Sequence, residues 1–166
     1  MIVRRAVPTD AAALAELARR TFADTFAAEN RPEDISAYLA KTYGETQQRR
    51  EIEDPDTVTL LVHDRETLVA FAQLRRSSSR YGEVELARFY VHREHHGRGI
   101  AQALMSASID AARELSGATL WLGVWEHNPR AIRFYEKCGF RDVGSQPFVL
   151  GSDLQTDRVM TLDIPR

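Results

Sequence analysis

Apolar side chains in the first part of the chain recur every three or four positions, as on the buried face of a helix. Between residues 10 and 25 this repeat predicts one helix with a single apolar stripe. A weaker helical pattern covers residues 32–53 and is interrupted near Gly44. A short strand is expected before both helices, over residues 2–6. The stripe of the first helix consists of Leu14, Leu17, Ala18, Thr21, Phe22 and Thr25.

The middle of the chain changes to the β-rich composition of strands. Residues 57–62 and 67–74 predict a hairpin whose turn lies at residues 63–66. Residues 83–92 predict a further strand, and residues 97–115 return to helical spacing. A strand that leads directly into a helix is therefore expected near the centre of the sequence.

The last part of the chain alternates again between strand and helix. Residues 118–125 predict a strand, residues 129–137 a short helix, and residues 140–150 and 157–162 two final strands. The predicted order is a strand, two helices, three strands, a helix, a strand, a helix and two strands. This order indicates an α/β fold around one central mixed sheet rather than a strictly alternating doubly wound fold.

Composition fits one globular domain over residues 1–166, because 43% of the residues are hydrophobic, 28% are charged, and no repeat or linker interrupts the pattern. No apolar run approaches the roughly 20 residues of a membrane helix, so no membrane partner is expected. A formal net charge of −2 disfavours general nucleic-acid binding, which usually needs a basic surplus. With one cysteine, Cys138, and no signal-peptide core at its start, the chain is expected to be cytoplasmic.

A turn with two glycines joins the predicted strand at 83–92 to the helix after it. Residues 96–101 read His-Gly-Arg-Gly-Ile-Ala. Small residues let a ligand approach the backbone, and free N–H groups at a helix start attract phosphate. The dinucleotide fingerprint is excluded because Gln102 stands where its third glycine would be, and the P-loop's Gly-Lys-Ser/Thr is missing. Alone, the turn fits either an anion site or a tight structural connection.

The spacing around this turn is more specific. His96 follows Val91, the end of the strand, by five positions, and is itself followed by two residues, Gly99, one residue and Ala101. This arrangement resembles motif A of the GNAT acetyltransferases, in which Gln or Arg precedes two variable residues, Gly, one variable residue and Gly or Ala. Gly99 and Ala101 match the motif, whereas His96 departs from the usual Gln or Arg.

A second segment, residues 121–140, resembles motif B of the same family. The motif has Asn, then Ala-Ile, Phe-Tyr and Gly-Phe, which here are Asn128, Ala131-Ile132, Phe134-Tyr135 and Gly139-Phe140. The two motifs occur in the family order and on predicted elements of the right type. Residues 148–157 also resemble the PaiA-type subgroup, whose known members acetylate polyamines.

The resemblance implies a single-domain GNAT fold, a mixed and mostly antiparallel sheet of about seven strands flanked by helices. It also implies acetyl-CoA as the acetyl donor and no metal, with pyrophosphate on the glycine turn and the pantetheine arm along the preceding strand. The residues expected to bind the cofactor are Phe89, Tyr90, Val91, His96, Gly97, Arg98, Gly99, Ile100, Ala101, Asn128, Tyr135 and Lys137.

Tyr135 is the candidate general acid, because the resemblance places the tyrosine of the Phe-Tyr pair beside the thioester sulfur. A phenol with a pKa of about 10 and a thiol with a pKa near 8.5 can share a proton late in the reaction. The structural alternative is a tyrosine of the helix core. Asn128 also has two readings: by resemblance it hydrogen-bonds pantetheine, and by position it caps the helix that begins at Pro129.

Glu85 is the candidate base. An amine that titrates like lysine, with a pKa near 10.4, is neutral in about one molecule in 2,500 at pH 7, so a base or water must take its proton. Glu85 lies six residues before Val91, where histone acetyltransferases of this superfamily carry their base, and strand alternation predicts that Glu85, Ala87, Phe89 and Val91 share one face. The alternatives are water and an ordinary solvated carboxylate. Other members have an acidic residue at the position of Gly123, which cannot serve here.

Other charged and histidine residues carry weaker hypotheses. Arg98 and Lys137 fit either cofactor phosphates or the solvated surface. His92, His95 and His96 have no carboxylate or thiolate set at ligand spacing, so no metal site is expected.

The acceptor is expected to be a primary amine of a small molecule or a peptide, held, by resemblance, by the N-terminal helices and C-terminal strands. Asp24, Glu29, Asp34 and Tyr38 would suit a cationic polyamine, and equally an ordinary helix surface. The alternative function is a regulatory protein that senses acetyl-CoA without transferring the acetyl group. Retention of both Tyr135 and a carboxylate at Glu85 argues against that alternative. The sequence leaves open whether the protein forms a homodimer.

Overall fold

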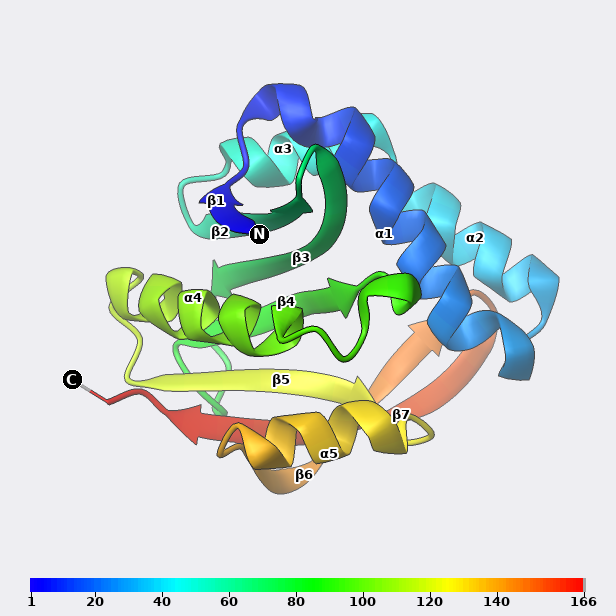
Figure 1. The fold of residues 1–166 in the computed structure, drawn as a ribbon. Coiled ribbons are helices and arrows are strands. Elements are labelled where there is room, and N and C mark those ends of the chain that lie inside the picture. Colours follow the sequence, from blue (N-terminus) through cyan, green and yellow to red (C-terminus); the bar gives the residue numbers. More distant parts are fainter. Residues whose placement is uncertain (166) are drawn as a thin grey trace.

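A computed structural model describes residues 1–165, which fold around one seven-stranded sheet (Figure 1). The strands lie in the order β1-β2-β3-β4-β5-β7-β6, and all neighbours are antiparallel except β4 and β5. The predicted mixed, mostly antiparallel sheet is therefore confirmed. The strands are β1 (Ile2–Arg5), β2 (Thr57–Asp64), β3 (Thr67–Arg76), β4 (Val84–Val91), β5 (Thr119–Trp125), β6 (Arg141–Leu150) and β7 (Asp153–Asp163).

Five α-helices flank the sheet in the described part of the chain. They are α1 (Ala11–Phe26), α2 (Pro32–Thr42), α3 (Glu45–Glu53), α4 (Ile100–Glu114) and α5 (Pro129–Lys137). The break predicted near Gly44 is confirmed, because Gly44 has an extended backbone and separates α2 from α3. Over residues 1–165, none of the helices is long and apolar enough to cross a membrane.

Two element boundaries differ by three residues or more from those predicted. The helix expected from Gly97 begins only at Ile100, because Gly97 and Gly99 have φ angles of +79° and +78°, outside the right-handed helical region. The last strand begins at Asp153 rather than at residue 157, because its first residues pair with the end of β6. The first residues of this strand are mostly polar, so the pattern of hydrophobic positions does not indicate that they belong to a strand.

The two faces of the sheet bury separate hydrophobic clusters. Leu104 of α4 and Tyr135 of α5 belong to one cluster, and Phe22 of α1 and Ile35 of α2 belong to the other. Figure 1 shows α4 and α5 in front of the sheet. We call the face of the sheet that buries the first cluster the α4/α5 face, and the face that buries the second cluster the α1/α2 face.

A bulge in β4 changes which residues share a face. Gln73 of β3 pairs with Arg88, whereas Leu74 pairs with Leu86, so Ala87 has no partner in the register. Such an extra residue reverses the alternation of side chains that follow it. Leu86 and Phe89 consequently both join the cluster on the α4/α5 face.

The predicted sharing of one face by Glu85, Phe89 and Val91 is therefore wrong. Phe89 and Val91 pack into the α4/α5 cluster, as does Leu86, the neighbour of Glu85. Glu85 points to the opposite side of β4, where its carboxylate pairs with Arg75. The prediction assumed that side chains alternate strictly between the two faces along the strand, and the bulged residue Ala87 interrupts that alternation.

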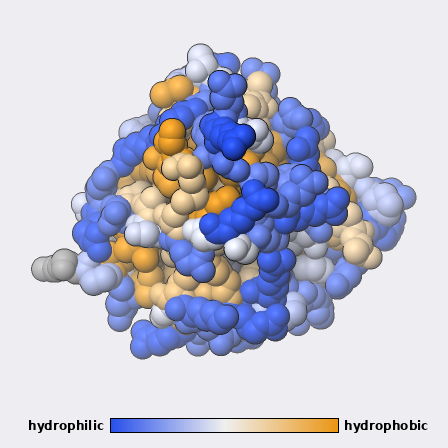
Figure 2. Space-filling model, viewed as in Figure 1, coloured by the Kyte–Doolittle hydropathy of each residue, from blue (hydrophilic) through white to orange (hydrophobic). Residues whose placement is uncertain are grey.

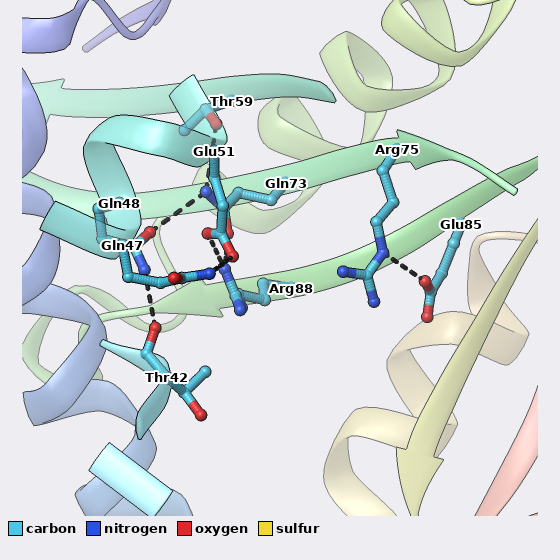
Figure 3. Close-up of polar contacts among 9 residues, drawn as sticks. All are labelled: Thr42, Gln47, Gln48, Glu51, Thr59, Gln73, Arg75, Glu85 and Arg88. Carbon is cyan, nitrogen blue, oxygen red and sulfur yellow. Dashed lines mark hydrogen bonds and ion pairs between the residues drawn. The ribbon is translucent and has the colours of Figure 1, made fainter. Parts of the chain in front are cut away.

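A polar network links α3 to β3 and β4 on the α1/α2 face (Figure 3). Arg88 donates hydrogen bonds to Glu51 and Gln73. Gln73 Nε2 in turn donates to Gln48 Oε1 at 3.3 Å and to Thr59 Oγ1 at 3.2 Å. The side chains of Arg88 and Glu51 are only 12% and 17% exposed. A guanidinium this buried depends on its anionic partner.

We expect Glu51→Ala to lower the free energy of unfolding by about 3–5 kcal/mol, because Arg88 would stay buried without a counter-charge. Glu45→Ala is the matched control on the same helix. Glu45 lies 3.6 Å from Arg49 on the exposed surface, and such pairs contribute about 0–1 kcal/mol. Urea unfolding of both variants measures the difference, and equally small losses would contradict this role of the network.

Candidate active site

β4 and β5 are parallel neighbours that pair at only two positions, Val84 with Leu120 and Glu85 with Trp121. Beyond these positions the strands separate toward their carboxyl ends (Figure 1). A cavity of about 880 Å³ lies at this separation, within the usual size range of ligand pockets. Residues from both faces of the sheet line it, from α1 and α2 on one side to α4 and α5 on the other.

The end of β4 presents unpaired backbone to the cavity. β3 pairs with β4 on its far side, and β5 supplies no partner beyond Glu85. Phe89, Tyr90 and Val91 line the cavity. The ring Nε2 of His96 lies 2.8 Å from the carbonyl oxygen of Val91 and so ties the glycine turn to the strand end.

The glycine turn lies at one end of the cavity, with His96, Gly97, Gly99, Ile100 and Ala101 in the wall, and its binding of pyrophosphate stays a prediction. A Cβ at Gly97 or Gly99 would meet nothing within 4 Å, so glycine is needed there for its left-handed backbone. Over residues 1–165, no backbone N–H from 97 to 102 donates to a backbone carbonyl. These free N–H groups, at the positive end of α4, favour an anion.

The cations in the cavity wall differ from the two that the sequence suggested for the cofactor phosphates. Arg93 and Arg130 line the cavity, whereas Arg98 and Lys137 do not. Arg98 is 60% exposed and lies 3.7 Å from Asp64, and Lys137 is exposed at the end of α5. Sequence reasoning missed Arg93 and Arg130 because the chain is rich in arginine and nothing local distinguishes these two.

Tyr135 reaches the cavity from α5 and is otherwise buried. Its ring packs edge-on against Phe89, with centroids 6.1 Å apart, and against Phe140 at 5.7 Å. Burial raises the pKa of Tyr135 well above the ordinary value, and the nearby Cys138 adds to the rise. The hydroxyl therefore stays protonated at neutral pH, as a proton donor requires.

Asn128 lies both at the N-terminus of α5 and in the cavity wall. Its Oδ1 accepts a hydrogen bond from the N–H of Ala131 at 3.3 Å, which confirms that it caps α5. The same residue lines the cavity. Its contact with a pantetheine arm stays a prediction.

Glu85 lies outside the cavity wall. It sits where β4 is still paired with β5, and Arg75 Nε is 2.7 Å from its Oε1 (Figure 3). The structure therefore does not bring the predicted acid and the predicted base together.

The opposite end of the cavity lies on the α1/α2 face. Asp24 and Tyr38 line it, as expected for acceptor residues, but Glu29 and Asp34 do not. Asp34 instead accepts hydrogen bonds from the N–H and Oγ of Ser152, at 2.9 and 2.7 Å, and so holds the turn between β6 and β7.

Asp157 of β7 also lines this end and was missed by sequence reasoning. Burial raises its pKa to about 6, and the charge of Glu126 contributes. A lone Asp in a predicted strand carries no signal of its own. Only the pairing of β7 with β5, which places Asp157 opposite Trp125, brings it to the cavity.

Figure 2 shows the face that carries α4 and α5. Hydrophilic side chains cover the loop between β4 and α4, and paler and apolar patches lie over α4 and between it and α5. In the described part of the chain, no three His, Cys, Asp or Glu side chains gather as metal ligands. The surroundings suit a ligand with anionic groups and an apolar arm.

Comparison with known proteins defines the class. Residues 13–140 match the model of the acetyltransferase (GNAT) family. The chain therefore belongs to the GNAT acetyltransferase family and is an acyltransferase, as the two sequence motifs predicted.

Three relatives illustrate the similarity. An uncharacterized N-acetyltransferase of Lactobacillus delbrueckii subsp. lactis is 35% identical over 146 residues, which cover 85% of this chain and 84% of that protein. The spermine/spermidine N(1)-acetyltransferase of Bacillus subtilis is 32% identical over 68 residues, 40% of this chain and 45% of that protein. PaiA N-acetyltransferase from Thermoplasma acidophilum, solved in complex with coenzyme A, has the same fold, with a TM-score of 0.83 at 23% identity over 98% of each chain.

We expect Gly99→Ala to weaken acetyl-CoA binding and to cost about 1–2 kcal/mol of stability, because alanine disfavours the left-handed backbone that begins α4. Gly44→Ala is the matched control, since Gly44 has a φ of −85° and open space around its Cβ position. Calorimetric titration with acetyl-CoA measures the first effect and thermal unfolding the second. Equal affinities of the two variants would contradict the assigned role of the turn.

Proposed function

We propose that the protein transfers the acetyl group of acetyl-CoA to a primary amine by direct attack in a ternary complex. The observation that carries the proposal is the position of Tyr135 in a cavity that joins the glycine turn to the α1/α2 face. A donor entering from the turn and an acceptor entering from the other face would meet beside this hydroxyl. Bringing two reactants together in this way supplies a large part of the rate.

The cofactor would lie along the opening between β4 and β5. Its pyrophosphate would meet the N–H groups at 97–101 and the guanidinium groups of Arg93 and Arg130, which suit phosphate oxygens. The pantetheine arm would follow the free edge of residues 89–91, near Asn128. Membership in the GNAT family supports acetyl-CoA as the donor.

In this proposal Tyr135 is the general acid. The amine nitrogen attacks the thioester carbonyl, the C–N bond forms and the C–S bond breaks. The sulfur leaves with its electron pair and receives the proton of the Tyr135 hydroxyl. The phenol is surrounded by Phe89, Phe134 and Phe140, which exclude water from this step.

The acceptor is proposed to be a polyamine-like small molecule or a peptide amine. Asp24 and Asp157 give the acceptor end negative charge, and Tyr38 and Phe148 give it aromatic walls. The name of one relative, a spermine/spermidine N(1)-acetyltransferase, also supports a cationic amine. Arg88 lies in the same wall, but Glu51 balances its charge.

A panel of amines tests the proposal. The purified protein is incubated with acetyl-CoA and spermidine, an amino acid, an aminoglycoside or a peptide with a free N-terminus, and released CoA thiol is measured. We expect turnover with at least one amine and most with spermidine. Bound acetyl-CoA without turnover of any amine would instead identify a sensor of acetyl-CoA.

We expect Tyr135→Phe to lower kcat about 100-fold or more with little change in acetyl-CoA affinity, because only the acidic proton is removed. Tyr81→Phe is the matched control, since Tyr81 lies outside the cavity and its hydroxyl accepts a hydrogen bond from Arg80. Steady-state kinetics with the best amine and calorimetry with acetyl-CoA provide the two readouts. Unchanged turnover in Tyr135→Phe would remove Tyr135 as the acid.

A further inference from the structure

Asp157 lies on β7, between β5 and β6, on the acceptor side of the cavity. It is the Cα partner of Trp125 on β5 and of Gln146 on β6. Only 9% of the residue is exposed, and that exposed part faces the cavity. A carboxylate at this depth, on a strand that is paired on both sides, is held in a fixed place.

This carboxylate has no partner of its own. Between residues 1 and 165, no hydrogen-bond donor and no cation pairs with its oxygens, and burial, with the charge of Glu126, raises its pKa to about 6. Other carboxylates with little exposure are engaged, as Asp10 is with Arg4 and Asp34 with Ser152. A buried, unpaired carboxylate costs stability, so its surroundings are adapted to a cation that arrives with a ligand.

Gly123 of β5 leaves the space into which Asp157 extends. A Cβ at position 123 would lie 2.9 Å from Asp157 Oδ2 and 2.7 Å from Gln146 Nε2. The carboxylate therefore lies over β5 beside the opening between β4 and β5. A side chain at position 123 would displace it from this place.

We propose that Asp157 binds the ammonium group of the acceptor and is the base that takes its proton. This inference rests on the proposed acetyl transfer and adds to it the residue that receives the amine at the cavity's acceptor end.

Each proton that moves in the proposed reaction has a donor and an acceptor. A bound ammonium group gives one proton to a carboxylate oxygen of Asp157, and the neutral nitrogen then attacks the thioester carbon. A second proton leaves the nitrogen as the amide forms, while Tyr135 gives one proton to the departing sulfur. Asp157 releases its proton to solvent and the Tyr135 phenolate regains the other, so the products are the amide, CoA thiol and one proton.

The other charged and titratable groups around Asp157 fit this role. Glu126, at the end of β5, adds negative charge, and Tyr38 of α2 lies close enough for the Asp157 charge to raise the pKa of its phenol. Asp24 of α1 adds a second carboxylate to the wall, and Arg88 of β4 is paired with Glu51. The local charge is therefore acidic and attracts a cation.

The experiment compares Asp157→Asn with wild type in kcat/KM for the best amine, from pH 5 to 9. Wild-type kcat/KM should fall about tenfold per pH unit below about pH 6, as Asp157 becomes protonated. In Asp157→Asn we expect kcat to fall about 100-fold or more. The decline of kcat/KM below about pH 6, which we call the break near pH 6, should disappear. Asp157→Glu, which keeps a carboxylate, should retain more activity than Asp157→Asn.

Two controls make the result specific. Asp163→Asn makes the same change on the same strand, at a side chain that is 80% exposed, and should keep both the rate and the break. Thermal unfolding at pH 7.5 should show Asp157→Asn at least as stable as wild type. The pKa of Asp157 is raised by folding, so its ionisation above pH 6 costs stability that the amide avoids.

The outcomes separate this inference from the proposed function. A wild-type protein that acetylates no amine overturns the proposed function and this role together. A wild-type protein that acetylates an amine, with Asp157→Asn retaining its rate and the break near pH 6, overturns the role of Asp157 alone. Loss of the break in Glu85→Gln instead would assign the base to Glu85.

Discussion

The separation of β4 from β5 is the constraint on which the rest of the site depends. Had the two parallel strands stayed paired beyond Glu85 and Trp121, hydrogen bonds would close the middle of the sheet. Instead the strands part, the backbone of residues 89–91 loses its partner on that side, and a cavity connects the two faces of the sheet. Unpaired backbone is expensive when buried, so this edge is suited to a ligand that supplies hydrogen bonds.

The structure supports this opening from both sides. On the α1/α2 face, Arg88 and Glu51 fasten β4 to α3 just past the bulge at Ala87, where β5 no longer holds the strand. On the other face, His96 ties the glycine turn to the end of β4, and Tyr135 packs against Phe89. The gap is thus bordered by side chains of β4, α3 and α5 and by the glycine turn tied to β4, which favours a preorganised site.

Local signals predicted most of the fold. Hydrophobic spacing, the break at Gly44 and the glycine turn each act over a few residues, so the order of elements and the position of the turn could be read from the sequence. The pairing register between strands that are distant in the sequence could not be read from it. One bulged residue, Ala87, reversed the face assigned to Glu85, and Asp157 came to the cavity only through the pairing of β7 with β5. The side chain of Arg98 lies outside the cavity wall for a similar reason, since it is 3.7 Å from Asp64 of the distant β2–β3 hairpin.

A crystal structure of the protein with coenzyme A would show where the cofactor lies relative to the opening between β4 and β5. We predict pyrophosphate on the N–H groups of residues 97–101, the pantetheine arm along residues 89–91, and the thiol sulfur within hydrogen-bond reach of the Tyr135 hydroxyl. Coenzyme A bound outside this opening, or with its sulfur far from Tyr135, would contradict the account.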